Sequence, residues 1–67
     1  MRLDKSKVQI AMARECMNPY DLCRTASITY QTYQRVVSKG QTCKPATIGK
    51  IAKALNVKVE DLIEGSE

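Results

Sequence analysis

The sequence predicts an all-α fold of five short helices, arranged as one compact domain over residues 1–67. Apolar side chains recur at intervals of three and four residues along most of the chain, which is the period of a helix buried on one side. Capping and turn residues separate these stretches, and no stretch keeps the strict alternation of a strand. A chain of 67 residues has room for one domain, and because it buries only about 60% of its unfolded surface, the core must be compact.

The first two helices are predicted over residues 4–16 and 19–26. Asn18 is a favourable N-cap, Pro19 suits the first helical position, and Asp21 stands where a capping box has its acidic residue. These residues predict a sharp start for the second helix. The inward apolar positions are Val8, Ala11, Met12 and Cys16 in the first helix and Leu22, Cys23 and Ala26 in the second.

The remaining helices are predicted over residues 30–38, 45–55 and 59–63. Residues 30–38 would also suit a strand by composition, but the apolar positions in this segment have helical spacing. Thr29 can cap its start, and Gly40 fits a left-handed turn after its end. The inward positions are Tyr33, Val36 and Val37, then Ile48, Ile51, Ala52 and Leu55 with Asn56 as a cap, and finally Leu62 and Ile63.

Several classes of chemistry are excluded or disfavoured. The chain has no His, so Ser-His-Asp and Cys-His catalytic pairs and His-ligated metals are ruled out. Its three Cys residues are an odd number without Cys-x-x-Cys spacing, which predicts free thiols in a reducing cytoplasm. No apolar run predicts an export signal or a membrane span. We therefore expect no enzyme activity, no cofactor and no metal, and we interpret Glu60, Asp61 and Glu64 as surface charge.

The charges are unevenly distributed along the chain. Residues 22–59 contain seven basic side chains and no acidic one, whereas residues 60–67 contain four acidic side chains and no basic one. This pattern fits an uneven solvated surface as well as it fits nucleic-acid binding. Arg24, Arg35, Lys39 and Lys44 are expected to face an anionic partner, and Lys50, Lys53 and Lys58 to be solvated elsewhere.

The predicted helices on either side of Ser27 form a helix-turn-helix. Cys23 is small where the two helices would touch, and Ile28 is apolar in the turn. The outward residues of the later helix are Tyr30, Gln31, Gln34 and Arg35. Gln can pair with adenine and Arg with guanine in the major groove of DNA, while Tyr30 can contact a thymine methyl group or a phosphate. Residues suited to the DNA backbone are Thr29 and Thr32 by their hydroxyls, and Lys39 and Lys44 beside the next loop.

With these helices and outward residues, the chain resembles the phage-repressor and Cro type of helix-turn-helix protein, also called the XRE family. The resemblance covers residues 3–64 and includes the stretch from Asn18 to Gly40. It also includes the tail Ile51-Ala52-Lys53-Ala54-Leu55-Asn56-Val57, followed by Glu60-Asp61-Leu62-Ile63. It implies a lambda-repressor-like five-helix fold that binds double-stranded DNA as a homodimer, with the third helix in the major groove of a palindromic operator.

The resemblance also implies roles for individual residues. Tyr30, Gln31 and Arg35 match base-reading positions, and Gln34 lies beside them. Asn18 matches a phosphate contact at the start of the second helix, and Ser38 and Lys44 match contacts from the loop. The positions implied near a dimer partner are Val57, Val59 and Leu62.

The chain departs from the family pattern at several positions. Pro19 replaces a phosphate-binding Gln, so Asn18 or Tyr20 must substitute for it. Ser27 replaces a turn glycine, at a cost if its backbone is left-handed. The segment 38–40 is one residue longer than usual. Tyr33 stands in place of a smaller apolar residue. Met12 and Val37 stand in place of an Arg–Glu pair, and well-packed apolar side chains can replace such a buried ion pair without loss of stability.

Two functions remain after this comparison. The first is a sequence-specific DNA-binding transcriptional regulator, most simply a repressor. The second is a protein-interaction module, such as an antitoxin or the partner of an anti-repressor, with the acidic tail after Val59 as a docking element. A DNA reader is expected to lose affinity steeply as salt is added.

Overall fold

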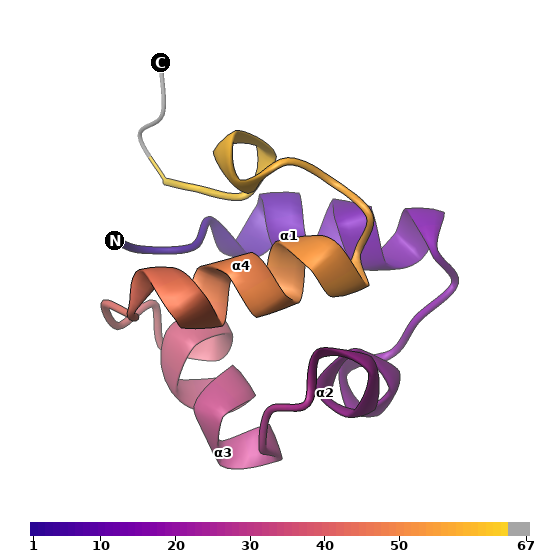
Figure 1. Ribbon diagram of the computed structural model, residues 1–67, viewed down its shortest axis with the longest axis horizontal. Helices are drawn as coiled ribbons and strands as arrows, with labels where there is room; N and C mark the ends of the chain where they lie inside the picture. Colours follow the sequence, from indigo (N-terminus) through magenta and orange to yellow (C-terminus); the bar gives the residue numbers. More distant parts are fainter. Residues whose placement is uncertain (65–67) are drawn as a thin grey trace.

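The computed structural model describes residues 1–64 and is built from helices (Figure 1). Within this range the only β pairing is an isolated antiparallel bridge between Leu3 and Ile63. The all-α prediction is therefore confirmed. The α-helices are α1 (Lys5–Arg14), α2 (Pro19–Ala26), α3 (Tyr30–Tyr33) and α4 (Pro45–Ala54), and the others are the π-helix η1 (Gln34–Ser38) and the 3₁₀ turn η2 (Val59–Asp61).

The starts of the first helices follow from local capping. Asp4 accepts a hydrogen bond from the Lys7 amide at 3.1 Å and so caps α1. The end of α1 differs from the prediction, because the helix stops at Arg14 and Cys16 adopts a φ of 55° with an exposed side chain. The prediction that Cys16 belongs to the inward stripe is therefore wrong.

The predicted helix over 30–38 has the right extent but two geometries. It begins as the single α-helical turn α3 and continues as the π-helix η1, in which the Lys39 amide donates to the Gln34 carbonyl at 2.9 Å. A π-helix pairs residues i and i+5, so it holds more residues per turn than an α-helix. Gly40 follows η1 with the expected left-handed φ of 66°.

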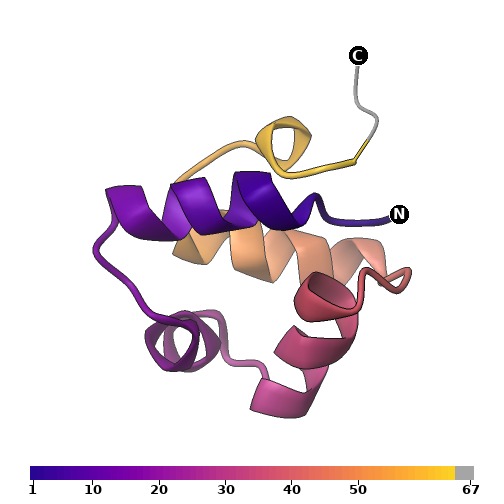
Figure 2. The same cartoon turned by 180° about the vertical axis from the view of Figure 1, so that it is seen from behind.

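The expected fifth helix is not formed as predicted. Among residues 1–64, the segment after α4 has only the 3₁₀ turn η2, which ends at Asp61 rather than at Ile63. Beyond η2 the backbone pairs with the N-terminal segment: Asp4 N–H donates to the Leu62 carbonyl at 2.8 Å, and Glu64 N–H donates to the Arg2 carbonyl at 3.0 Å. These groups are thereby unavailable for a longer helix. Figure 2 shows the two segments on the same side of the molecule.

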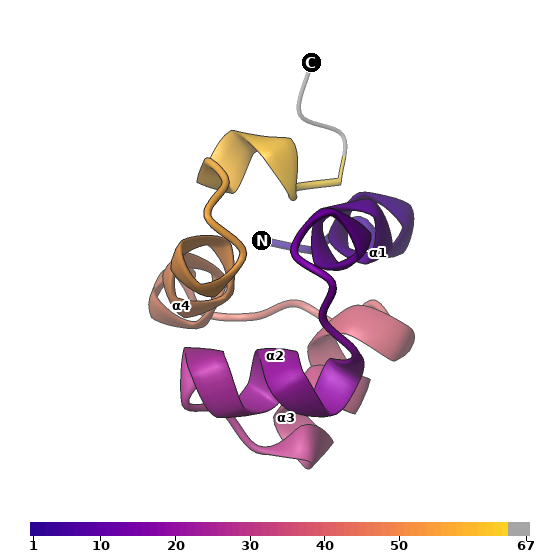
Figure 3. The same ribbon diagram turned by 90° about the vertical axis from the view of Figure 1, so that its right-hand side faces the viewer.

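The core takes apolar side chains from α1, α2, α3, η1 and α4, and Val59 of η2 packs against it half-buried. Leu22, Ile48 and Leu62 are completely buried, and Ile28 packs against the core from the turn. No polar or charged residue is buried within the described part of the chain. Met12 and Val37 are both buried, so the positions that replace an Arg–Glu pair are filled by apolar packing. Figure 3 shows α2 and α3 at one end of the molecule, α1 and α4 in the middle, and η2 at the opposite end.

Candidate nucleic-acid interface

The turn between α2 and α3 brings the two helices together. Ser27 ends α2 in a left-handed conformation, with φ 59° and ψ 43°, and the Ile28 amide donates to the Cys23 carbonyl at 3.0 Å. Cys23 is buried at the contact, and its Sγ donates to the Thr29 carbonyl at 3.8 Å. Desolvation on burial raises the pKa of the Cys23 thiol. The small side chain at position 23 therefore allows the close approach that the sequence predicted.

The start of α3 is capped by a threonine side chain. Thr29 Oγ1 accepts a hydrogen bond from the Thr32 amide at 3.1 Å and lies 2.9 Å from the Thr32 hydroxyl. This confirms Thr29 as an N-cap. It also means that the two hydroxyls expected to meet a DNA backbone are already paired with each other, so a phosphate would share them.

The outer face of α3 and η1 matches the predicted pattern. Gln31, Gln34 and Arg35 are exposed, and Tyr30 is 37% exposed. The opposite face is buried and consists of Tyr33, Val36 and Val37. Tyr33 is therefore a core residue, as its spacing predicted. The four outward residues lie together on the surface, without an acidic residue within the segment 30–38.

Beside this face lies an open hollow of about 560 Å³. It brings together Thr32, Arg35 and Lys44, which the sequence predicted separately, and adds Thr42 and Thr47. None of the described residues that line it is acidic. Two cationic side chains and several hydroxyl donors suit a phosphate group. Thr47 could have been found from the sequence, since it lies one helical turn after Lys44.

The loop after η1 is held by the backbone at both ends. The Gln41 amide donates to the Arg35 carbonyl at 3.1 Å, and the Cys43 amide donates to the Met1 carbonyl at 2.8 Å. The pKa of the Cys43 thiol is raised by desolvation, an effect partly offset by the nearby N-terminal amine. Ser38 and Lys39 are exposed where the loop begins. Of the contact residues predicted in this region, Lys44 lines the same hollow as Arg35, and Ser38 and Lys39 are exposed.

The start of α2 is only partly available to a ligand. The Asn18 Oδ1 accepts from the Asp21 amide at 2.8 Å, and Asp21 Oδ2 accepts from the Asn18 amide at 3.1 Å, which confirms the capping box. Because the backbone N–H of Asn18 is bonded to Asp21, the donor that the cap leaves unused is the side-chain nitrogen of Asn18, Nδ2. Arg24 Nη2 lies 2.7 Å from Asp21 Oδ1 in an exposed ion pair. Part of the positive charge expected from Arg24 is therefore already offset.

Sequence reasoning missed a stack of aromatic rings across the two helices. The rings of Tyr20 and Tyr30 have centroids 4.8 Å apart at an interplanar angle of 14°, and those of Tyr30 and Tyr33 are 5.8 Å apart at 17°. Burial raises the pKa of Tyr33, with smaller contributions from Tyr30 and Cys23. The spacing of Tyr30 and Tyr33 gives a signal in the sequence, but the contact with Tyr20 depends on how α2 crosses α3.

With this geometry established, comparison with known proteins identifies the family. The family model of the Cro/C1-type HTH DNA-binding domain matches residues 7–66. This chain belongs to that family. No curated protein and no solved structure gives a significant match. Membership of the Cro/C1-type family makes the chain a helix-turn-helix DNA-binding protein, and none of its described helices is long and apolar enough to cross a membrane.

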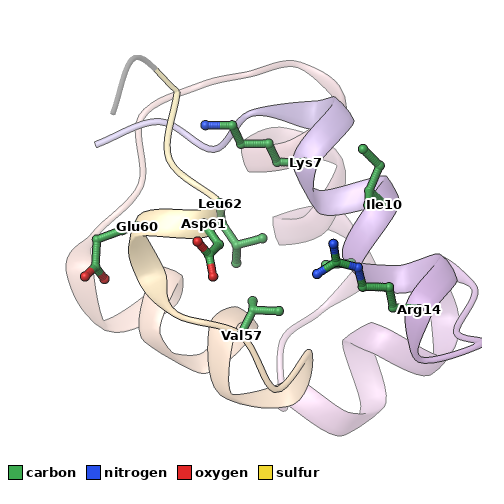
Figure 4. Close-up of a pocket in the computed structure, with 8 residues that line it drawn as sticks. Lys7, Ile10, Arg14, Val57, Glu60, Asp61 and Leu62 are labelled. Atoms are coloured by element: carbon green, nitrogen blue, oxygen red, sulfur yellow. The ribbon is translucent and has the colours of Figure 1, made fainter. Parts of the chain in front are cut away.

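The residues expected at a dimer interface lie at the other end of this Cro/C1-type domain. Val57 and Val59 are half-buried, whereas Leu62 is completely buried and can support such a surface only from beneath. Beside them, a hollow of about 440 Å³ separates α1 from η2. In Figure 4, Arg14 and Asp61 extend toward it from opposite sides, and Ile10 on α1 is 56% exposed.

Proposed function

We propose that this protein is a sequence-specific transcriptional regulator that represses by occupying an operator in double-stranded DNA. One observation carries the proposal: an exposed, acid-free face of Gln and Arg side chains lies directly over a buried apolar face of the same helical segment. The buried face fixes the orientation of the exposed one. Such a face on the second helix of a helix-turn-helix suits the major groove.

Each outward side chain has a chemistry that suits base edges. Gln31 and Gln34 can each donate to and accept from adenine, and Arg35 can donate two hydrogen bonds to guanine. Tyr30 offers a hydroxyl at the same surface. These four residues are proposed to read the sequence.

The DNA backbone is proposed to be held by groups on both sides of the reading face. Their donors suit phosphate oxygens, which position the protein without reading sequence. On one side is the side-chain nitrogen Nδ2 of Asn18 at the start of α2, and on the other the hollow beside Arg35. The proposed backbone contacts are Asn18, Thr29, Thr32, Ser38, Lys39 and Lys44.

We further propose that the regulator acts in the cytoplasm as a homodimer. Its three thiols are unpaired in the structure, which suits a reducing compartment. The proposed interface uses Val57 and Val59, with Leu62 beneath them and the exposed Ile10 nearby. A dimer joined at this end would leave both copies of α3 free, and it requires an operator with two inverted half-sites.

The test begins by selecting DNA that the full chain binds from a pool of random duplexes. Arg35→Ala and Gln31→Ala are each expected to lose discrimination at one base pair by ~1–3 kcal/mol, about 5- to 150-fold in relative affinity. Lys58→Ala is the matched control for loss of charge, because Lys58 is exposed and directly precedes η2, at the end of the molecule opposite α3 (Figure 3).

The outcomes separate the proposed reading surface from non-specific attraction. Lys58→Ala is expected to select the parent sequence with affinity within about twofold, and Lys44→Ala to lower the salt dependence by about one phosphate contact. A palindromic selected site supports the homodimer. If Arg35→Ala and Gln31→Ala select the same DNA as the parent protein, α3 does not read bases, and a role in binding another protein becomes the better explanation.

A further inference from the structure

The stacked tyrosines connect the core of the protein to the proposed reading surface. The chain has three Tyr residues and no Phe or Trp, so all of its aromatic rings belong to this one stack. Exposure rises along the stack, from 5% for Tyr33 to 37% for Tyr30 and 64% for Tyr20. The innermost ring is fixed by the core, and the outermost ring lies on the surface of α2.

Tyr30 is the member of the stack that is placed to meet DNA. It is the first residue of α3 and contacts two nearly parallel rings, one on its own helix and one on α2. Both separations lie in the range of favourable offset stacking, 4.5–7 Å. Two such contacts restrict the rotamers that the Tyr30 side chain can adopt. A ring held in one orientation loses less conformational entropy when it binds.

Tyr20 supplies the nearer of these two contacts. With a centroid separation of 4.8 Å it stacks more closely on Tyr30 than Tyr33 does at 5.8 Å. Its own ring remains mostly exposed, so it contributes little to the core. Its position is also not on α3, the helix proposed to read bases. The contact that it makes with Tyr30 is therefore its clearest structural role.

We propose that Tyr20 is a positioning residue for base recognition: its ring holds Tyr30 in the orientation in which Tyr30 reads the operator. The preference at the base pair next to Tyr30 then depends on an aromatic ring at position 20. This inference rests on the proposed function, because it assigns a cause to the orientation of one of its reading residues. It differs from a phosphate contact by Tyr20 itself, which would use the hydroxyl rather than the ring.

The experiment measures binding of the full chain to its selected DNA site and to variants of that site at each base pair. Tyr20→Ala is expected to weaken binding about threefold to tenfold, which corresponds to the loss of one aromatic stacking contact. It is also expected to reduce the preference at one base pair. Tyr20→Phe keeps the ring and is expected to bind within about twofold of the parent. Tyr20→Leu, an apolar side chain without a ring, is expected to behave like Tyr20→Ala.

A double-mutant cycle then separates positioning from direct contact. In a Tyr30→Ala background, Tyr20→Ala is expected to have an effect of less than about twofold, because the ring that it positions is gone. A role in folding alone would lower the thermal midpoint of Tyr20→Ala without changing the base preference. That result contradicts the proposal. A second contradicting result is that Tyr20→Phe loses as much DNA-binding affinity as Tyr20→Ala does, and that this loss persists in the Tyr30→Ala background.

Arg35→Ala, measured in the same assay, separates this inference from the proposed function. If Arg35→Ala loses base discrimination while Tyr20→Ala binds as the parent does, the positioning role is wrong and the proposed function stands. If Arg35→Ala, Gln31→Ala and Tyr20→Ala all bind every DNA as the parent does, both are wrong.

Discussion

The left-handed backbone at Ser27 predicts that glycine at this position stabilises the fold. Ser27 has φ 59° and ψ 43°, and its side chain is exposed. A residue with a Cβ is strained by about 1–2 kcal/mol in this conformation. Glycine removes the strain but increases the entropy of the unfolded chain, at a cost of about 0.5–1 kcal/mol. Ser27→Gly is therefore expected to raise the free energy of unfolding by about 0.5–1 kcal/mol.

The backbone contacts of the turn survive this substitution. The Ser27 amide donates to the Arg24 carbonyl at 3.3 Å, and neither this bond nor the one made by the Ile28 amide involves the serine side chain. For a domain of this size, about 1 kcal/mol shifts the thermal midpoint by roughly 4–8 °C. The expected rise of about 2–8 °C is measurable by circular dichroism during thermal unfolding.

The chain offers a matched control with the opposite sign. Ser6 is exposed within α1, where the backbone is a right-handed helix. Ser6→Gly makes the same chemical change and is expected to lower stability by about 0.5 kcal/mol, the difference in helix propensity. If Ser27→Gly lowers the thermal midpoint as Ser6→Gly does, or leaves it unchanged, the argument from backbone strain is refuted.

Two further predictions concern the cap of α2 and the response to alkaline pH. Asn18→Ala removes the side-chain acceptor of the capping box and is expected to lower the free energy of unfolding, measured in urea, by ~1 kcal/mol. Asn18→Asp keeps an acceptor, so its free energy of unfolding is expected to fall little. Equal losses in the two variants would argue against the cap. Burial raises the pKa of Cys23 and of Tyr33 above their ordinary values of 9.0 and 10.0, so the unfolded chain loses these protons first. The free energy of unfolding is therefore expected to stay at its full value below about pH 9 and to fall as the pH rises further. The fall is expected to be smaller in Cys23→Ala. A urea midpoint that does not change between pH 8 and pH 10.5 would contradict this expectation.

Helix starts were predictable from the sequence where one side chain satisfies a nearby backbone group. Asn18 with Asp21, and Thr29 with Thr32, cap helices through hydrogen bonds across three residues. Such interactions depend only on the local sequence. The inward positions were also predictable, since helical spacing decides which side chains share a face. Cys16 is an exception because α1 ends before the stripe does, and Ile63 is another, since it is only half-buried and pairs with Leu3 instead of continuing a helix.

The features that sequence reasoning missed depend on residues far apart in the chain. η2 is short because residues 62–64 pair with residues 2–4, a contact that no local pattern encodes. The stack of Tyr20 on Tyr30 requires the observed crossing of α2 and α3. The π-helical turn likewise leaves the pattern of apolar residues unchanged, since Val36 and Val37 are inward in both geometries. Periodicity therefore predicts which face is buried better than it predicts how the helix is wound.

The distribution of charge becomes more informative once the ion pairs are known. Arg24 is paired with Asp21, whereas Arg35, Lys39 and Lys44 form no ion pair with any described residue. No charged residue is buried among residues 1–64, and these three cations are exposed at the surface beside α3. The acidic η2 lies at the opposite end of the molecule (Figure 3). We expect the three cations beside α3 to add to the attraction between the proposed reading surface and DNA, and because that attraction arises from exposed cations, added salt is expected to weaken it.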